Sequence, residues 1–205
     1  MRMRESLTAH SRVAARQPRA ARYTAVFGAP FSNPGPKLGI RMNGDALCAI
    51  DFVSAKHPDQ PPVTMAARRI AAQLQAYFKN PRTPFTLSLE FHGTPFQEKV
   101  WRALQNIPAG TVCSYGELAR RLHTGARAIG NACRGNPIPI IIPCHRIVGV
   151  QYVPVAAAQS RRPRGSFDAG TSAPHSAHGL GGYCGAYGGA QLAVKRWLLA
   201  HEQRT

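Results

Sequence analysis

Alternating apolar and polar positions over residues 23–90 predict short strands around a single helix. The predicted strands cover residues 23–27, 39–42, 47–53 and 86–91. Asn43-Gly44, between the second and third strands, is a strong hairpin signal. Residues 63–78 carry apolar side chains at the spacing of one helix face, and Asn80-Pro81 ends that helix. These elements predict a small mixed strand and helix domain that serves as a scaffold and carries no recognisable chemistry of its own.

Three helices are predicted at the start of the mainly helical second half, residues 91–205. The first opens at Thr94-Pro95-Phe96-Gln97, which has the composition of a capping box with proline in the first turn. The second opens at a similar box, Ser114-Tyr115-Gly116-Glu117, and the third covers residues 126–134. The turn His123-Thr124-Gly125 gives the last two helices the proportions of a helix-turn-helix. An ordinary helical hairpin is the alternative.

The charge of the chain favours a polyanionic partner. Its 205 residues include 26 Lys and Arg against 9 Asp and Glu, a formal net charge of +17. No acidic residue lies between Glu117 and Asp168, a stretch that contains Arg120, Arg121, Arg127, Arg134 and Arg146. Such an unbroken basic stretch suits phosphates. No apolar run approaches the roughly 20 residues that span a bilayer, so no membrane association through a spanning helix is expected.

The N-terminus and the cysteines indicate a reducing compartment. The first 22 residues hold six arginines and one acid without an apolar core, which predicts a disordered basic arm rather than a secretory signal. An organellar transit peptide is the alternative. The five cysteines form no C-x-x-C pair, so neither a disulfide framework nor a structural zinc site is expected. Neither a metal nor a cofactor is predicted, and we expect a cytoplasmic protein of the bacterial type.

The predicted helix over residues 126–134 is unusually slim. Its small residues include Ala126, Ala128, Gly130 and Ala132. Small side chains let a helix backbone approach its target closely, and a slim helix fits the narrow minor groove of DNA. Because that groove offers a degenerate code, weak sequence selectivity is expected.

A reactive cysteine is predicted at the end of the apolar run 138–142. Cys144 stands between Pro143 and His145, with Arg146 two residues on, and positive neighbours favour the nucleophilic thiolate. We expect this segment to be an extended strand. Since neighbouring side chains on a strand point to opposite sides, His145 is expected to act on Cys144 through a water molecule.

The segment Pro143-Cys144-His145-Arg146-Ile147 resembles the active-site signature of the O6-alkylguanine-DNA alkyltransferases. Further segments resemble this family in order and spacing: residues 93–98, Trp101, residues 107–112, 114–119 and 127–132, and residues 192–202, which resemble its C-terminal helix. The likeness is close over about residues 91–148 and again from residue 192. It implies an α+β fold with a variable N-terminal domain and a helix-turn-helix of winged-helix-like type.

The resemblance also implies a reaction and a set of catalytic residues. Cys144 would accept a methyl or larger alkyl group from O6 of guanine, or from O4 of thymine, in one irreversible turnover without a cofactor. His145 would serve as its base through a water, and Glu202 would orient His145. Asn136 would link the recognition helix to the reactive segment. Tyr115 would press on the phosphate of the target nucleotide and protonate the departing guanine.

The implied partner is double-stranded DNA, bound by a monomer through the minor groove with the damaged base flipped out. Arg127 would fill the stack that the base leaves. The implied DNA contacts are Ser114, Tyr115, Arg127, Ala128 and Arg134. The implied pocket residues are Pro139, Ile147, Val148, Tyr187 and Gly188.

The stretch between residues 149 and 191 departs from the family, which crosses it in about a dozen residues. A structureless loop of this length is uncommon in a compact domain, so about residues 151–183 are expected to be a disordered insertion. Arg161, Arg162 and Arg164 within it offer further phosphate contacts, and a frameshifted gene segment is the alternative. The insertion leaves the pocket tyrosine open between Tyr187 and Tyr183, with Gly188 at the usual spacing.

Three other functions stay open. An alkylguanine-binding relative with impaired transfer would sense the lesion without repairing it. A helix-turn-helix transcription regulator would prefer one DNA sequence and would not need Cys144. A cysteine hydrolase would use Cys144 and His145 for many turnovers on an ester or amide.

Overall fold

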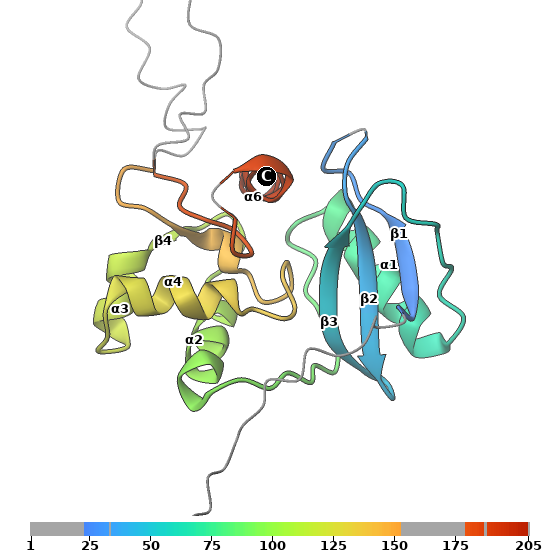
Figure 1. Cartoon of the computed structure of the whole chain (residues 1–205), viewed down its shortest axis with the longest axis horizontal. Coiled ribbons are helices and arrows are strands. Elements are labelled where there is room, and N and C mark those ends of the chain that lie inside the picture. Colours follow the sequence, from blue (N-terminus) through green and yellow to red (C-terminus); the bar gives the residue numbers. More distant parts are fainter. Residues whose placement is uncertain (1–22, 33, 153–178, 187, 205) are drawn as a thin grey trace, which may run out of the picture.

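The computed structural model describes residues 23–32, 34–152, 179–186 and 188–204. The predicted basic arm, most of the predicted insertion and Tyr187 lie outside these ranges. Within them, a three-stranded sheet with one helix forms one half of the molecule, and a group of short helices forms the other (Figure 1). The predicted α+β class is therefore confirmed.

The N-terminal half is built on an antiparallel sheet in the order β1-β2-β3. The strands are β1 (Ala25–Gly28), β2 (Lys37–Asn43) and β3 (Ala46–Val53). The predicted hairpin is confirmed: Asn43 pairs with Ala46, and Gly44 adopts a φ of 56°, which glycine tolerates without strain. Helix α1 (Met65–Lys79) begins at Thr64, whose hydroxyl accepts a hydrogen bond from the Ala67 amide, and ends within one residue of the predicted end.

The strand predicted over residues 86–91 is wrong. Only Leu89 pairs there, through an isolated bridge to Leu47. The cause lies in α1, because Gln73 Oε1 accepts a hydrogen bond from the Thr86 amide at 2.8 Å and Arg69 donates one to the Thr86 carbonyl at 2.8 Å. These side chains occupy backbone groups that a strand ladder would need.

The second half contains the three predicted helices, two of which begin at the predicted capping residues. They are α2 (Pro95–Gln105), α3 (Tyr115–Arg121) and α4 (Ala126–Arg134), and residues 122–125 join the last two. Thr94 and Gln97 form a full reciprocal capping box. At α3 the Ser114 hydroxyl caps the Glu117 amide, while the Glu117 carboxylate pairs with Arg121.

The reactive segment is not the extended strand that was predicted. Cys144–Arg146 form one turn of 3-10 helix, and only Ile147–Val148 (β5) are extended, in parallel pairing with Cys113–Ser114 (β4). Before it the chain makes a tight turn, in which the Ile142 amide donates to the Ile138 carbonyl and Ile140 has a φ of 78°. Prolines at 137, 139 and 143 lack the amide hydrogens that a ladder requires.

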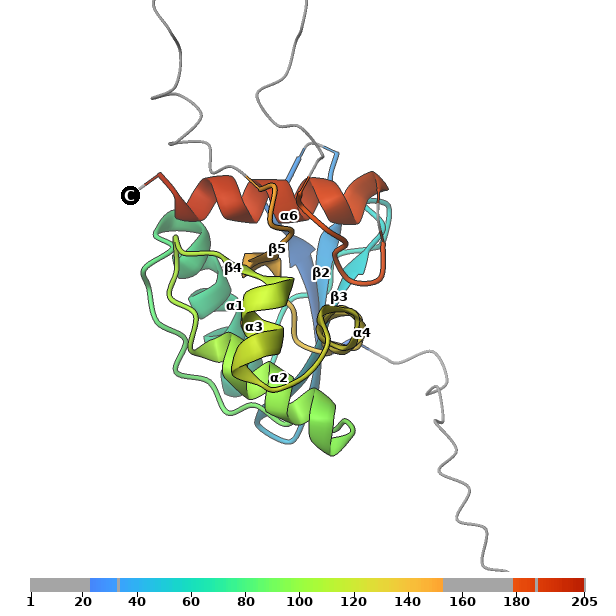
Figure 2. The same ribbon diagram turned by 90° about the vertical axis from the view of Figure 1, so that its left-hand side faces the viewer.

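Helix α6 (Gly189–Glu202) lies across both halves (Figure 2). On one side its Trp197 packs edge-on against Phe31 and Phe78 of the N-terminal half. On the other side Leu192 and Leu199 pack with Val148 of β5. Packing on both sides holds α6 in place, so that Glu202 at its end contacts His145 of the reactive segment. No helix in the described ranges is long and apolar enough to cross a membrane.

Candidate active site

Cys144 lies at a cavity of about 210 Å³ between the helix pair α3–α4 and the segment 181–185. Its thiol is almost completely buried, with 3% of the residue exposed. The cavity is lined by Tyr115, Ala126, Arg127, Gly130, Asn131, Cys133, Arg134, Cys144 and residues 181–185. The arrangement presents one buried nucleophile to any group that enters beside α4.

Asn136 fixes the position of the Cys144 sulfur. Its Nδ2 group donates to Cys144 Sγ at 3.1 Å and to the Ile142 carbonyl at 2.8 Å, while its Oδ1 accepts from the Ile138 amide. Asn136, just after α4, is thereby hydrogen-bonded to the reactive turn. A hydrogen bond from Cys184 lowers the pKa of Cys144, burial opposes it, and the Asn136 bond and the positive charge of Lys195 add to the lowering.

His145 and Glu202 form a fully buried pair, in which His145 Nε2 lies 2.9 Å from Glu202 Oε1. Burial would raise the pKa of Glu202, but His145 and Arg146 hold it well below its usual range. An ionised carboxylate only accepts hydrogen bonds, so Nε2 carries the proton and Nδ1 keeps a free lone pair. Burial lowers the pKa of His145, which favours the neutral imidazole. Among the described residues, His145 Nδ1 has no hydrogen-bond partner.

Arg146 and Tyr77 complete the surroundings of Glu202, and neither was recognised in this role from the sequence. Arg146 donates to both carboxylate oxygens, through Nη2 at 2.8 Å and Nε at 3.0 Å. Tyr77 donates its hydroxyl to Oε1 at 2.7 Å from α1, so the predicted scaffold domain contacts the catalytic pair. Tyr77 lies on the apolar face of α1, a position that indicates only core packing, and no sequence signal identifies this contact.

Lys195 is a third residue whose contacts at the site were not recognised from the sequence. It is fully buried in α6, and its Nζ donates to the carbonyls of Ile147, Leu180 and Gly182 at 2.6, 2.5 and 3.2 Å. Burial lowers the pKa of Lys195 to about 8. It joins β5 to the cavity wall. Its helical spacing from Leu192 and Leu198 is a signal that would have placed it on the buried face.

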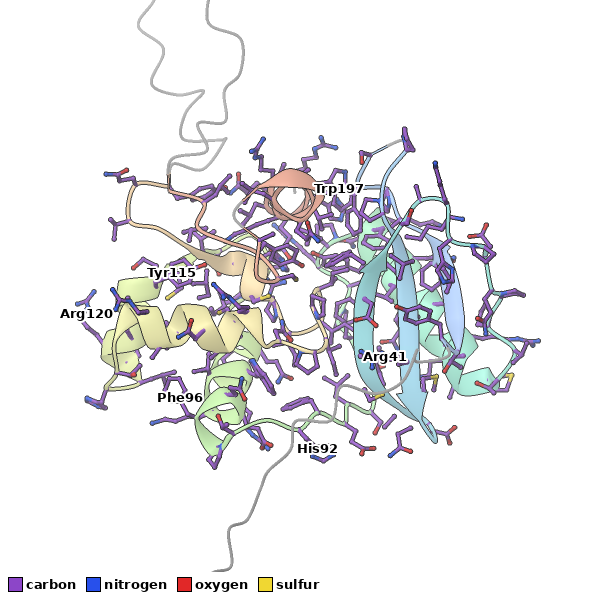
Figure 3. The ribbon with its side chains drawn as sticks, in the orientation of Figure 1. Arg41, His92, Phe96, Tyr115, Arg120 and Trp197 are labelled. Atoms are coloured by element: carbon purple, nitrogen blue, oxygen red, sulfur yellow. The ribbon has the colours of Figure 1, made fainter. Side chains whose placement is uncertain are left out.

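The residues predicted to contact DNA gather at the mouth of this cavity. Arg127 and Arg134 are exposed on α4 and line the opening, and Ala128 is partly buried beside them. Tyr115, labelled in Figure 3, is half-buried at the start of α3 and donates its hydroxyl to the Gly182 carbonyl at 3.3 Å. Ser114 caps α3. Their roles toward DNA stay predictions.

None of the predicted pocket residues that the structure describes lines the cavity. Pro139, Ile147 and Val148 are buried in the core, Gly188 is exposed at the start of α6, and none of the four lines the opening. Tyr187 lies outside the described residues. The wall is instead formed by residues 181–185, which include Tyr183, the alternative to Tyr187. The long insertion bears only on the spacing of Tyr187 and Gly188, because Pro139, Ile147 and Val148 precede it in the sequence.

Comparisons with known proteins agree with this geometry. Residues 95–162 match the family model for the DNA-binding domain of 6-O-methylguanine DNA methyltransferase. A methylated-DNA–protein-cysteine methyltransferase of Methanosarcina acetivorans is 36% identical over 134 residues, which cover 62% of this chain and 83% of that protein. The Mycolicibacterium paratuberculosis protein of the same name is 49% identical over 79 residues, 38% of this chain, and the match spans only about half (48%) of its length.

Solved structures with a similar fold come from proteins of the same kind. The structure of Mycobacterium tuberculosis OGT in complex with DNA superposes with a TM-score of 0.60 at 31% sequence identity, covering 87% of this chain and 91% of that one. The match therefore extends through both halves of the molecule, including the N-terminal half where the sequence resemblance is weak. Because the chain is 36% identical to the Methanosarcina acetivorans protein over 83% of that protein's length, it belongs to the methylated-DNA–protein-cysteine methyltransferase family.

Proposed function

We propose that this protein repairs DNA by transferring a methyl or larger alkyl group from O6 of guanine to Cys144. The observation that carries the proposal is the buried thiol at the cavity, which receives a hydrogen bond from Asn136 and lies beside the His145–Glu202 pair. A thiolate in such surroundings is a strong nucleophile toward an alkyl carbon. The transfer requires no cofactor.

The proton of Cys144 passes to His145 before the reaction. Neutral His145 offers a buried Nδ1 lone pair, which suits a water molecule that relays the proton, and ionised Glu202 stabilises the imidazolium that forms. The sulfur–carbon bond then forms as the carbon–O6 bond breaks, and Tyr115 protonates the departing guanine. The product is a thioether, which is not hydrolysed, so each protein molecule acts once.

The damaged base must leave the DNA helix to reach Cys144, because the thiol is buried at the cavity. We propose that the slim face of α4, where Ala126 and Gly130 line the opening, enters the minor groove. Arg127 fills the stack, and Arg134 contacts a phosphate. A monomer is sufficient for this arrangement, since one chain contains all of these residues.

The experiment is a single-turnover reaction with a duplex oligonucleotide that contains O6-methylguanine. After trypsin digestion, the peptide of residues 135–146 is expected to gain one methyl group, and Cys144→Ala is expected to bind the same DNA without any gain. Tight binding of the lesion without a methyl gain would favour an alkylguanine-binding protein. Repeated turnover on an ester or amide would favour a hydrolase, and strong preference for one undamaged sequence would favour a transcription regulator.

A further inference from the structure

A second cavity lies between the two halves of the molecule, beside the reactive turn. Its volume is about 340 Å³, compared with about 210 Å³ for the cavity at Cys144. Cys144 does not line it, so the two cavities are separate, and the proposed function assigns no role to the second one. Its walls come from Tyr77 of α1, the connection after α1, the end of α2 with the residues that follow it, residues 140, 141 and 143, and Arg146.

Arg146 offers this cavity hydrogen-bond donors that the protein itself does not use. A guanidinium group has five N–H donors. Nε and one N–H of Nη2 donate to Glu202, and one N–H of Nη1 donates to the Ile107 carbonyl. These contacts leave one N–H on Nη1 and one on Nη2 without an acceptor among the described residues. Arg146 is 9% exposed and lines the second cavity but not the cavity at Cys144, so its accessible surface faces the second cavity.

The charges along the second cavity favour an anion. Two arginines line it, Arg82 and Arg146, and its described lining residues include no aspartate or glutamate. Glu202 binds Arg146 without lining the cavity, so it balances part of that charge from outside, and the exposed Arg82 adds a positive charge at the entrance. Guanidinium groups suit carboxylates in particular, because their planar N–H donors match the two carboxylate oxygens. The polar part of the wall therefore fits a carboxylate.

Much of the remaining wall is apolar. The rings of Tyr77 and Phe85 lie 5.3 Å apart, and Leu87 and Ile140 line the same cavity. Ile140 has a φ of 78°, which a β-branched residue rarely adopts, and such strained positions are often found at ligand sites. An inorganic ion would leave this apolar surface in water, whereas a ligand with an apolar body would cover it. The cavity volume lies at the lower end of small-molecule sites, which span roughly 300–1,000 Å³.

We propose that the second cavity binds a small carboxylate with an apolar body. The carboxylate accepts hydrogen bonds from the unused N–H groups of Arg146, and the apolar body packs on Phe85, Leu87 and Ile140. The proposal does not depend on the proposed function, because Cys144 takes no part in it. A ligand in this cavity contacts the guanidinium group that binds Glu202, so it reaches the surroundings of the catalytic pair without entering the cavity at Cys144.

The first test measures binding of 4-fluorophenylacetate to the full chain by fluorine NMR. We expect a Kd of about 1 mM or tighter, as is ordinary for a ligand of about ten non-hydrogen atoms. Two matched compounds separate the charge from the apolar body: 4-fluorophenylacetamide lacks the charge, and acetate lacks the ring. The amide should bind at least about tenfold more weakly, since it cannot supply the anionic acceptor. Equal binding of the amide, or displacement of the probe by an equal concentration of acetate, overturns the proposal.

The second test locates the bound probe with proton–nitrogen NMR spectra of the labelled protein. We expect the probe to shift the backbone amide signals of Gln105, Ile107 and Ile141, which line the second cavity. Amide signals of residues 181–185, which line the cavity at Cys144, should stay in place. Shifts confined to residues 181–185 or to α4 overturn the proposal, because the probe would then occupy the cavity at Cys144.

The third test changes exposed residues at the entrance and leaves Arg146 in place, since its removal would leave Glu202 buried without its partner. Gln105→Trp fills the entrance from the end of α2 and should weaken probe binding at least about tenfold. Arg82→Gln removes one exposed charge and should weaken binding roughly threefold.

Lys99→Gln is the matched control for these variants, because Lys99 is an exposed cation of α2 that does not line the cavity. Binding should be unchanged in this variant, and thermal unfolding checks that all three variants are folded. Undiminished binding by Gln105→Trp overturns the proposal. A loss in Lys99→Gln as large as that in Arg82→Gln also overturns it, since net charge alone would then attract the probe.

Discussion

The hydroxyl group of Tyr77 donates a hydrogen bond of 2.7 Å to Glu202 Oε1, which joins the helix of the N-terminal half to the last residue of α6. Glu202 is the same carboxylate that holds His145, so the N-terminal half contributes directly to the catalytic pair. Burial and the negative charge of Glu202 raise the pKa of Tyr77 far above its usual range, so this phenol remains a donor. Glu202 Oε1 is therefore a contact shared by the N-terminal half and His145.

Tyr77→Phe removes that donor and keeps the ring. We expect a loss of about 1.5–3 kcal/mol in the free energy of unfolding, because a buried hydrogen bond to a charged group is lost. Transfer to Cys144 should slow several-fold, since Glu202 is less firmly placed beside His145. Urea unfolding and single-turnover transfer measure the two effects. Tyr23→Phe is the control, as Tyr23 packs on His57 away from the site, and an equal loss there would contradict the coupling.

Glu202→Gln should be severe because it leaves Arg146 buried without a counter-charge. Removing one partner of such a pair costs about 3–5 kcal/mol. The low pKa of Glu202 in the folded protein stabilises the fold above the unfolded value near 4, and this contribution is lost as the pH falls below about 4. Unfolding experiments should therefore find a gap between the original protein and Glu202→Gln that narrows in acid. A difference in the free energy of unfolding that does not change with pH would contradict the conclusion that Glu202 is ionised in the folded protein.

Lys195 should produce the opposite pH dependence. Its pKa is lowered to about 8 by burial, whereas an unfolded lysine titrates near 10.4, so between these values the unfolded chain binds more protons than the folded one. Stability consequently rises with pH over that window, by roughly 3 kcal/mol if no other group titrates. Lys195→Met lacks this rise. It also leaves the carbonyls of Ile147, Leu180 and Gly182 without their donor, so it should be less stable at pH 9.

The measurement for Lys195 is urea unfolding from pH 7 to 10 on both proteins. Arg196→Met is the matched control, because Arg196 is the exposed neighbouring cation on α6. A stability difference between the unchanged protein and Lys195→Met that does not grow with pH would show that Lys195 keeps its charge throughout. If Arg196→Met changes the pH dependence of the free energy of unfolding as much as Lys195→Met does, the change comes from the loss of a positive charge on α6 and not from the burial of Lys195.

Periodicity and capping residues predicted most helices because one side-chain face decides where a helix lies. Thr94 and Gln97 indicate the start of α2 correctly, and Asn43-Gly44 indicates the hairpin. Local signals failed where distant groups decide the outcome. Residues 86–91 alternate like a strand, yet side chains of α1 take the hydrogen bonds of Thr86. The periodicity of a sequence does not show that side chains from another element will bond to the backbone of a predicted strand.

The candidate site divides in the same way. Cys144 and His145 were singled out because they are neighbours in a short motif, whereas Asn136 and Glu202 were named only because of the family resemblance. Tyr77 was missed since it comes from a distant helix whose pattern indicates packing alone. The place of Cys184 at the cavity was not predicted because it depends on a turn with positive φ and on the insertion before it, neither of which periodicity reveals.

Arg127 tests how the damaged base is presented to Cys144. It is exposed at the cavity mouth on α4, where it can replace a base in the stack only if the substrate is a duplex. Arg127→Ala should therefore slow transfer from duplex DNA by about tenfold, in the range of one lost stacking contact, and leave transfer from free O6-methylguanine nearly unchanged. Arg120→Ala is the control, since Arg120 lies at the outer edge of α3 (Figure 3) and should weaken duplex binding only through its charge. Single-turnover rates on both substrates, measured at saturating DNA, separate these effects. Equal losses for Arg127→Ala on duplex and free base would assign Arg127 to the chemistry at Cys144 and remove it from the stack.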